Sequence, residues 1–255
     1  MEEQPKRKLR IGILSDSPFL RTGYATQACL FGNSMVDRGH EVFFFGSNYI
    51  GQTLQPGTKL EDGEVLKFWV IGGGREMYFK DLLPVYTKQY NLDILWILLD
   101  TFMMYPWILS LDLSPAKTIF YYPSDGGGGM PLGCEQILRF INCPVAMSKF
   151  AKDQVEKMYN LKTEYIPLTV DSKIFYPYPE PQRLELKRRW GFEGKFVVGS
   201  TYRNQGRKMA DRTFKSFKLF ADKNPDAILF LHTDPDDAAQ VFHTYSLISR
   251  LYCLV

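Results

Sequence analysis

Polar and basic residues follow the predicted buried strand Phe196–Ser200 and have the composition of an anion site. Residues 199–208 read Gly-Ser-Thr-Tyr-Arg-Asn-Gln-Gly-Arg-Lys and precede a predicted helix. A guanidinium and an ammonium in such a loop can neutralise a diphosphate, helped by the first N–H groups of the helix. The alternative is a solvated basic loop. Because the loop stands at a strand end, we favour a diphosphate site that uses Arg203 and Lys208.

A second candidate stands at the end of the predicted strand Thr118–Tyr122, where Pro-Ser-Asp is followed by four glycines. Ligands of open α/β sheets bind outside the carboxyl ends of the strands. The glycines let backbone approach a substrate closely and leave Asp125 accessible. The alternative is a flexible connector whose aspartate caps a turn. The position at a strand end favours a functional role.

The loop Ser15–Thr22 follows the first predicted strand and places Gly23 just before a helix. Backbone N–H groups at such a helix start can face a phosphate or a sugar hydroxyl. The loop is not a G-x-G-x-x-G sequence, so a dinucleotide-dependent dehydrogenase is poorly supported. A single glycine in a strand-to-helix turn is also ordinary structure, and the loop alone leaves both interpretations open.

The acidic stretch Asp234–Asp237 resembles the D-x-D of metal-dependent sugar-nucleotide enzymes and follows His232. We prefer a helix start, with acids in the first turn and proline near its first position. The histidines at 40, 232 and 243 share no ligand spacing, and no Ser-His-Asp set can be assigned. We therefore predict no metal site and no triad of that kind.

Strands and helices alternate through the first 170 residues and would position these groups. Continuous apolar strands need helices on both faces, so we predict a doubly wound parallel α/β sheet. The predicted strands are Leu9–Leu14, His40–Phe45, Leu66–Ile71, Ile94–Leu99, Thr118–Tyr122, Pro144–Met147 and Glu164–Pro167. The predicted helices are Tyr24–Arg38, Arg75–Tyr90, Leu132–Phe140 and Lys149–Met158.

A proline-rich stretch, Asp171–Gln182, interrupts this alternation and cannot continue a helix. Beyond it the pattern starts again with the basic helix Arg183–Trp190, the strand Phe196–Ser200, the helix Asp211–Lys223 and the strand Ala227–His232. Roughly 65 residues follow Gly191, fewer than the about 100–150 of an ordinary domain. We expect a complete first domain over 1–170, a crossing segment and basic helix over 171–190, and an incomplete second domain over 191–255.

Composition excludes several classes of protein. The chain has 255 residues, of which 45% are hydrophobic and 23% charged, with 31 Lys+Arg against 28 Asp+Glu, so it can form a core and is not disordered. No block of basic residues indicates nucleic-acid binding. Four dispersed cysteines fit a reducing compartment. No apolar run approaches the roughly 20 residues of a membrane span, and no secretory segment is recognisable. We expect a cytoplasmic protein, with a peripheral membrane contact of helix 183–190 as the alternative to a solvated helix.

With these residues in view, the chain resembles the GT-B glycosyltransferases of the retaining family 4 type. The motifs that carry the resemblance run in order over about residues 9–240: TGYATQ, RGHEV, YYPSDG, SKFAKDQVEK, IPLTVDSKIFYP, VVGSTYRNQGRK and LFLHTDP. The resemblance implies two Rossmann-like domains, of which the first faces the acceptor and the second the donor. It also implies transfer of a sugar from a nucleotide-diphosphate sugar, with retention of configuration and without a metal or other cofactor.

The resemblance further assigns roles to single residues. Arg203 and Lys208 would hold the donor diphosphate and stabilise the charge of the leaving group. Ser200, Asn204 and Gly23 would complete the donor site. Asp125 stands near the position where many members place a polar residue, often histidine, beside the reacting sugar.

One departure from the family leaves two interpretations open. Family members carry an E-x7-E segment well after the basic loop, and this chain ends before it. The chain is then either part of an active transferase or a non-catalytic fragment that binds a nucleotide sugar or a partner weakly. The expected partners are a nucleotide-sugar donor and a glycan, lipid or protein acceptor, with no nucleic acid.

Overall fold

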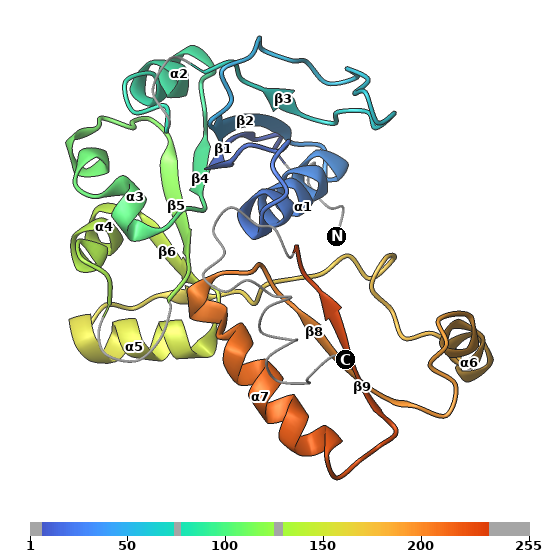
Figure 1. The fold of residues 1–255 in the computed structure, drawn as a ribbon. Helices are drawn as coiled ribbons and strands as arrows, with labels where there is room; N and C mark the ends of the chain where they lie inside the picture. The colour runs from blue at the N-terminus through green and yellow to red at the C-terminus, as the bar shows by residue number, and fades with distance from the viewer. Residues whose placement is uncertain (1–6, 74–77, 125–129, 235–255) are drawn as a thin grey trace, which may run out of the picture. The chain divides into compact units, whose positions relative to one another are not determined.

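A computed structural model describes residues 7–73, 78–124 and 130–234 of the chain (Figure 1). The chain divides into two compact units, Met1–Ile174 and Phe175–Val255. Each unit is described by itself. The division falls within the stretch that the sequence marks as a crossing segment.

The first unit contains a seven-stranded sheet whose paired strands all run parallel, in the order β3-β2-β1-β4-β5-β6-β7. Its central strand β1 pairs with β2 on one side and with β4 on the other. Every strand that the sequence predicts in this half is present. The strands are β1 (Arg10–Asp16), β2 (Glu41–Ser47), β3 (Trp69–Val70), β4 (Ile94–Ile97), β5 (Lys117–Tyr122), β6 (Cys143–Ala146) and β7 (Glu164–Tyr165).

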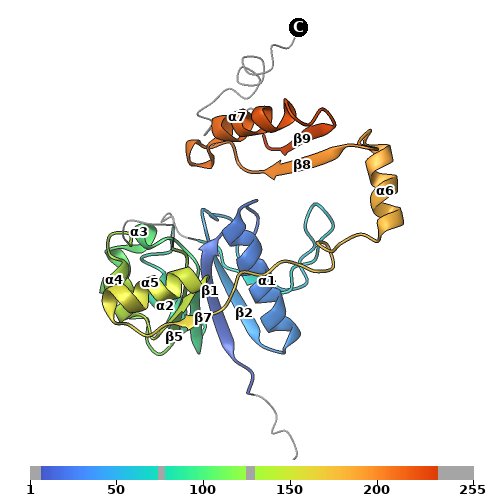
Figure 2. The same cartoon turned by 90° about the horizontal axis from the view of Figure 1, so that it is seen from below.

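Both faces of this sheet are buried, because successive residues of its strands enter two separate hydrophobic clusters. Ile13 belongs to one cluster and Leu14 to the other, as the two-residue period of a strand requires. Figure 2 shows α1 on one side of the sheet and α4 and α5 on the other, which confirms the doubly wound arrangement. These helices are α1 (Gly23–Asp37), α4 (Cys134–Phe140) and α5 (Lys149–Tyr159).

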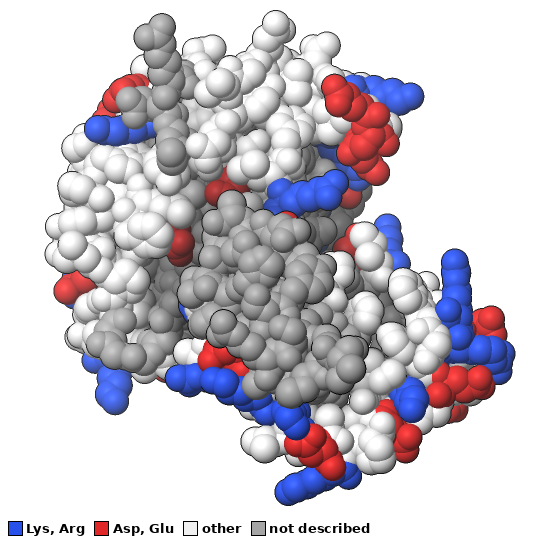
Figure 3. Space-filling model, viewed as in Figure 1, with Lys and Arg blue, Asp and Glu red and all other residues white. Residues whose placement is uncertain are grey.

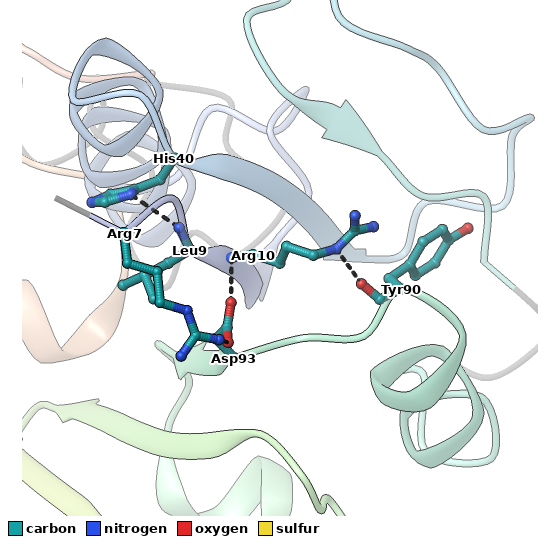
Figure 4. A network of polar contacts seen from close by, with 6 residues as sticks. All are labelled: Arg7, Leu9, Arg10, His40, Tyr90 and Asp93. Carbon is teal, nitrogen blue, oxygen red and sulfur yellow. Dashed lines mark hydrogen bonds and ion pairs between the residues drawn. The ribbon is translucent and has the colours of Figure 1, made fainter. Parts of the chain in front are cut away.

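Polar contacts at the amino ends of the strands fix the position of β1 (Figure 4). The Asp93 carboxylate accepts a hydrogen bond of 2.9 Å from the backbone N–H of Arg10. The Arg10 Nε donates in turn to the carbonyl of Tyr90 at 2.5 Å. On the other side, His40 Nδ1 accepts from the backbone N–H of Leu9 at 3.3 Å. The residues that precede β2 and β4 are thereby held against the start of β1.

Two elements differ from the sequence prediction. Of the helix predicted over Arg75–Tyr90, residues 75–77 lie outside the described residues. The described part forms α2 (Leu83–Gln89), and Phe79, with a φ of +59°, cannot belong to a regular helix. The strand predicted over 66–71 shortens to β3, since the preceding segment folds back and the backbone of Leu66 bonds to Gly57 and Thr58. The short helix α3 (Thr101–Met104) and the 3₁₀ turn η1 (Trp107–Ser110) have no counterpart in the prediction.

The second unit repeats the strand–loop–helix–strand pattern once. Strands β8 (Phe196–Thr201) and β9 (Ala227–His232) pair in parallel, and α7 (Ala210–Ala221) connects them. The 3₁₀ turn η2 (Gly206–Lys208) precedes α7, and α6 (Glu180–Arg189) precedes β8. In the described part of this unit, the buried side chains are Asn204, Ala210 and Phe214.

Candidate functional site

The strand order of the first unit has its switch point between β1 and β4. The chain leaves β1 through α1 toward β2, whereas it leaves β4 toward β5 on the opposite side of the sheet. Open α/β sheets bind ligands in the crevice outside the carboxyl ends of strands at this point. Asp16 ends β1, and Asp100 follows β4 by three residues. Both acids therefore stand at the edge where a ligand is expected.

Hydroxyl groups hold both carboxylates in place. Thr22 Oγ1 donates to Asp16 Oδ2 at 2.6 Å, and Ser47 Oγ lies 3.3 Å from Asp16 Oδ1. Tyr24 donates from its phenol to Asp100 Oδ1 at 2.7 Å. Thr22 also caps α1, since its Oγ1 accepts from the backbone N–H of Ala25. The loop after β1 thus organises the helix start and orients the acids together.

The charges of Asp16 and Asp100 also act on Tyr78, whose ring stacks on Trp107. Burial raises the pKa of its phenol, and the negative charges of Asp16 and then Asp100 raise it further. The phenol therefore remains protonated at neutral pH and can donate a hydrogen bond. Sequence reasoning missed Asp16, Asp100 and Tyr78, because only the strand order brings them together. The available signal was an aspartate within two residues of the end of each of two apolar runs.

Gly23, predicted as a donor-site residue, is the first residue of α1. A Cβ added at this position would meet no described atom within 4 Å. The space around that Cβ is therefore open among the described residues, and a contact of the Gly23 N–H with a donor phosphate stays a prediction. Asp125 lies outside the described residues, and its proposed place beside the reacting sugar stays a prediction.

The remaining predicted site residues lie within nine positions of one another in the second unit. Ser200 is the penultimate residue of β8 and is half-buried, and Asn204 is 1% exposed. Arg203 and Lys208 are exposed, one before and one within η2. Asn204 is thus buried beside two exposed cations, and their part in an anion site stays a prediction. Gly23 belongs to the other unit.

Three features at the strand ends of the second unit were not predicted. Met209 caps α7 with a φ of +52°, a left-handed conformation that side chains other than glycine rarely adopt, and it offers no side-chain bond to the helix. Tyr202 and Thr233 follow β8 and β9 directly, and the hydroxyl of each is buried with no hydrogen-bond partner in the described part of the chain. Such groups are uncommon in folded proteins.

Two other parts of the sequence are alternative site candidates. Among the described residues, no group of three His, Cys, Asp or Glu side chains could hold a metal ion, and only Asp234 of the acidic stretch 234–237 is described. On α6, Arg183 pairs with Glu180 and Arg188 with Glu185, and Figure 3 shows both signs of charge side by side there. This pairing favours a solvated helix over a contact with an anionic membrane surface. None of the helices described is both long and apolar enough to span a bilayer.

No protein-family model matches the chain, and no curated protein does. Solved structures do. HepE of Anabaena, crystallised in complex with UDP, superposes with a TM-score of 0.61 at 16% identity, covering 96% of this chain and 66% of its own. A glycosyltransferase of Rickettsia africae superposes with a TM-score of 0.58 at 16% identity, covering 91% of this chain and 69% of its own. The α,α-trehalose-6-phosphate synthase of Burkholderia multivorans superposes with a TM-score of 0.55 at 12% identity, covering 96% of this chain and 69% of its own.

These similarities bear on the fold. They agree with the parallel seven-stranded sheet followed by a second strand–loop–helix–strand unit, and the chain spans about two thirds of the length of the matched structures. The chain has the α/β architecture of the GT-B glycosyltransferases, over part of their length.

Proposed function

We propose that this chain is a glycosyltransferase polypeptide of the retaining family 4 type that takes its sugar from a nucleotide-diphosphate donor without a metal ion. The observation that carries the proposal is the loop between β8 and α7, which presents Arg203 and Lys208 at the end of a parallel strand. The similarity to HepE, which was crystallised with UDP, supports a donor of this class.

In the proposed reaction the bond between the anomeric carbon and the donor phosphate breaks, and a hydroxyl of the acceptor takes its place. Negative charge then grows on the leaving diphosphate. Arg203 and Lys208 would stabilise this charge by direct contacts, and single contacts of this kind are worth on the order of 10²–10³ in rate. Two cations at the diphosphate remove the need for a divalent ion, which is why we propose that the reaction is independent of metal.

The other predicted residues take supporting roles in this proposal. Ser200 and Asn204 would line the donor pocket, and the backbone N–H of Gly23 would approach the donor phosphate. Asp125 would contact the reacting sugar. The acceptor would be a glycan, a lipid or a protein with a free hydroxyl.

We also propose a cytoplasmic location. Cys29, Cys134 and Cys143 are free thiols, and burial raises the pKa of the first to about 11 and of the second to about 12. Both thiols are protonated and unreactive at neutral pH. This is ordinary for a protein of a reducing compartment, where cysteines serve as small apolar side chains.

The proposal is tested by titrating the full chain with UDP and GDP in a calorimeter, with EDTA and then with added Mg²⁺ or Mn²⁺. We expect one of the two nucleotides to bind, and its affinity to change less than threefold between these conditions. The absence of binding by either nucleotide would overturn the proposed donor class. A strict requirement for a divalent ion would overturn the role of the loop cations and direct attention to the acidic stretch 234–237.

A further inference from the structure

A groove of about 600 Å³ runs along α7 in the second unit. Figure 2 shows α7 on one side of the β8–β9 pair, where it packs over β9. Two side chains of β8, Phe196 and Val198, therefore border the open groove. From α7 its walls include Arg212, Phe217 and Phe220. The groove thus lies between one face of α7 and the strand that this helix leaves uncovered.

The two ends of the groove differ in chemistry. Lys208, Met209 and Arg212 lie at the amino-terminal end of α7. At the other end the ring centroids of Phe196 and Phe220 are 5.7 Å apart, and the two residues are 60% and 39% exposed. Between Arg212 and Phe220 the helix rises about 12 Å, at about 1.5 Å per residue. The groove is thus cationic at one end and mostly apolar beyond it.

The positive charge at this end has no acidic counterpart in the groove. No Asp or Glu lines it, and in the described part of the chain the exposed Arg212 forms no ion pair, whereas Lys215 on the same helix pairs with Asp211 at 3.5 Å. Met209 provides no side-chain cap, so the first N–H groups of α7 add to the positive potential. A guanidinium in this setting favours a phosphate, which it can bind through two parallel N–H bonds.

A ligand with the same asymmetry fits this groove best. An uncharged apolar molecule would leave the guanidinium without a counter-charge, and a small anion would leave Phe196, Phe217 and Phe220 in water. We propose that the groove binds a free single-chain amphiphile with a phosphate head group, the phosphate at Arg212 and the alkyl chain between α7 and β8. Lys208 remains the proposed contact of the donor diphosphate, so this inference does not depend on the proposed function, and its test uses no nucleotide.

Calorimetric titration of the full chain with n-octyl phosphate and n-decyl phosphate, each below its micelle concentration, tests the proposal. We expect one decyl phosphate to bind per chain, about 4- to 15-fold more tightly than octyl phosphate, because one or both of its additional methylene groups are buried. Inorganic phosphate, which has the head group alone, should bind on the order of 100-fold more weakly or less. Failure of decyl phosphate to bind, or equal affinity for the three ligands, would overturn the proposal.

Substitution of the cation tests where the head group lies. Arg212→Gln removes the charge and keeps a long side chain, and it should weaken binding of decyl phosphate by roughly 10- to 150-fold, as loss of a charge-assisted contact requires. Lys215→Gln is the matched control, because it removes an equal charge from α7 outside the groove. Its affinity for decyl phosphate should stay close to that of the native chain. Equal losses in the two variants would reduce the effect to net charge and overturn the assignment of Arg212.

Filling the groove tests where the alkyl chain lies. Ser216 is an exposed residue of α7 that lines the groove, so Ser216→Phe should block the alkyl chain and make octyl and decyl phosphate bind equally. Lys215→Phe adds the same ring outside the groove and should preserve the difference between the two ligands. A chain-length difference that persists in Ser216→Phe would show that the alkyl chain binds elsewhere and would overturn the proposal.

Sedimentation of the native chain tests the competing occupant, a second copy. Among the described strands β8 pairs only with β9, so its other edge is open to a strand of another molecule. We expect decyl phosphate to bind a monomer, or to dissociate any dimer that covers the groove. A dimer whose stability decyl phosphate does not change, in a chain that fails to bind the ligand, would assign the groove to a second copy and overturn the proposal.

Discussion

The two units use the same strand–loop–helix–strand pattern but bury their strands to very different degrees. In the first unit, Ile13 and Phe44 lie on strands with a neighbour on each side and are 0% exposed. In the second unit, β8 and β9 pair only with each other among the described strands, and Phe196 is 60% exposed. An apolar strand is buried by its neighbours as much as by its own sequence. The group around Asp16 therefore rests on a buried sheet, and the basic loop around Arg203 on a lightly packed one.

Hydrogen exchange gives the largest expected contrast between the two units. Because opening of β8 and β9 exposes little buried surface, we expect their amides to exchange on the order of 100-fold faster than those of β1, β2, β4 and β5. Mass spectrometry of peptides from residues 196–232 and 9–122 measures the difference. Equal protection of the two regions would break the comparison.

A core substitution in the first unit should have the next largest effect. Phe45 is 0% exposed and packs against the rings of Phe79 and Tyr86. Phe45→Ala should lower the free energy of unfolding by about 3–5 kcal/mol, through lost burial and the cavity left behind. Urea denaturation followed by circular dichroism measures it, with Val85→Ala, at a 54% exposed position, as the control that should change it by less than about 1 kcal/mol.

A smaller effect is expected at the loop that links α1 to the acids. Thr22→Ala removes the cap of α1 and the hydrogen bond to Asp16, and it should lower the free energy of unfolding by about 1 kcal/mol. Thr26→Ala is the matched control, because the exposed Thr26 hydroxyl bonds only to the carbonyl of Thr22. If both variants unfolded at the same urea concentration as the native chain, Thr22 would not organise this edge.

The smallest expected effect is a gain of stability in the second unit. Asparagine tolerates the left-handed conformation better than methionine does, so Met209→Asn should stabilise the second unit by a few tenths of a kcal/mol. Met158→Asn, at a similarly exposed position inside α5, should destabilise by about 0.5 kcal/mol instead. A higher melting temperature for Met209→Asn together with a lower one for Met158→Asn would support strain at Met209. Equal losses of stability in the two variants would exclude it.

The sequence predicts most of the fold because its signals are local. Continuous apolar runs become strands, and Gly39, with a φ of +86°, ends α1 where a helix stop is expected. The start of α2 escapes prediction because Phe79 adopts a left-handed conformation for the sake of aromatic packing, and no local pattern announces this. The fold-back that shortens β3 is likewise a contact between two segments, Leu66 with Gly57 and Thr58, which an apolar run does not specify.

The two candidate sites differ in the same way, because one follows from local sequence and the other from the pairing of distant strands. Arg203 and Lys208 are adjacent in the sequence to a strand end and a helix start, so the loop can be located without a structure. The group around Asp16 and Asp100 depends on β1 lying next to β4, a pairing between segments about 80 residues apart, which apolar runs do not specify. The charges of these acids also act on Tyr78, which lies in a third segment that the sequence predicts as helix.

Calorimetry with UDP on the native chain, Arg203→Ala and Arg207→Ala tests the central claim most directly. Each variant lacks one exposed guanidinium of the same loop, so an effect of net charge alone on UDP binding would be equal in the two variants. We predict that Arg203→Ala weakens UDP binding by roughly 10- to 150-fold, as loss of a charge-assisted phosphate contact of about 1.5–3 kcal/mol requires, and that Arg207→Ala weakens it much less. Equal affinity of the native chain and Arg203→Ala would contradict the account and leave the loop as a solvated turn.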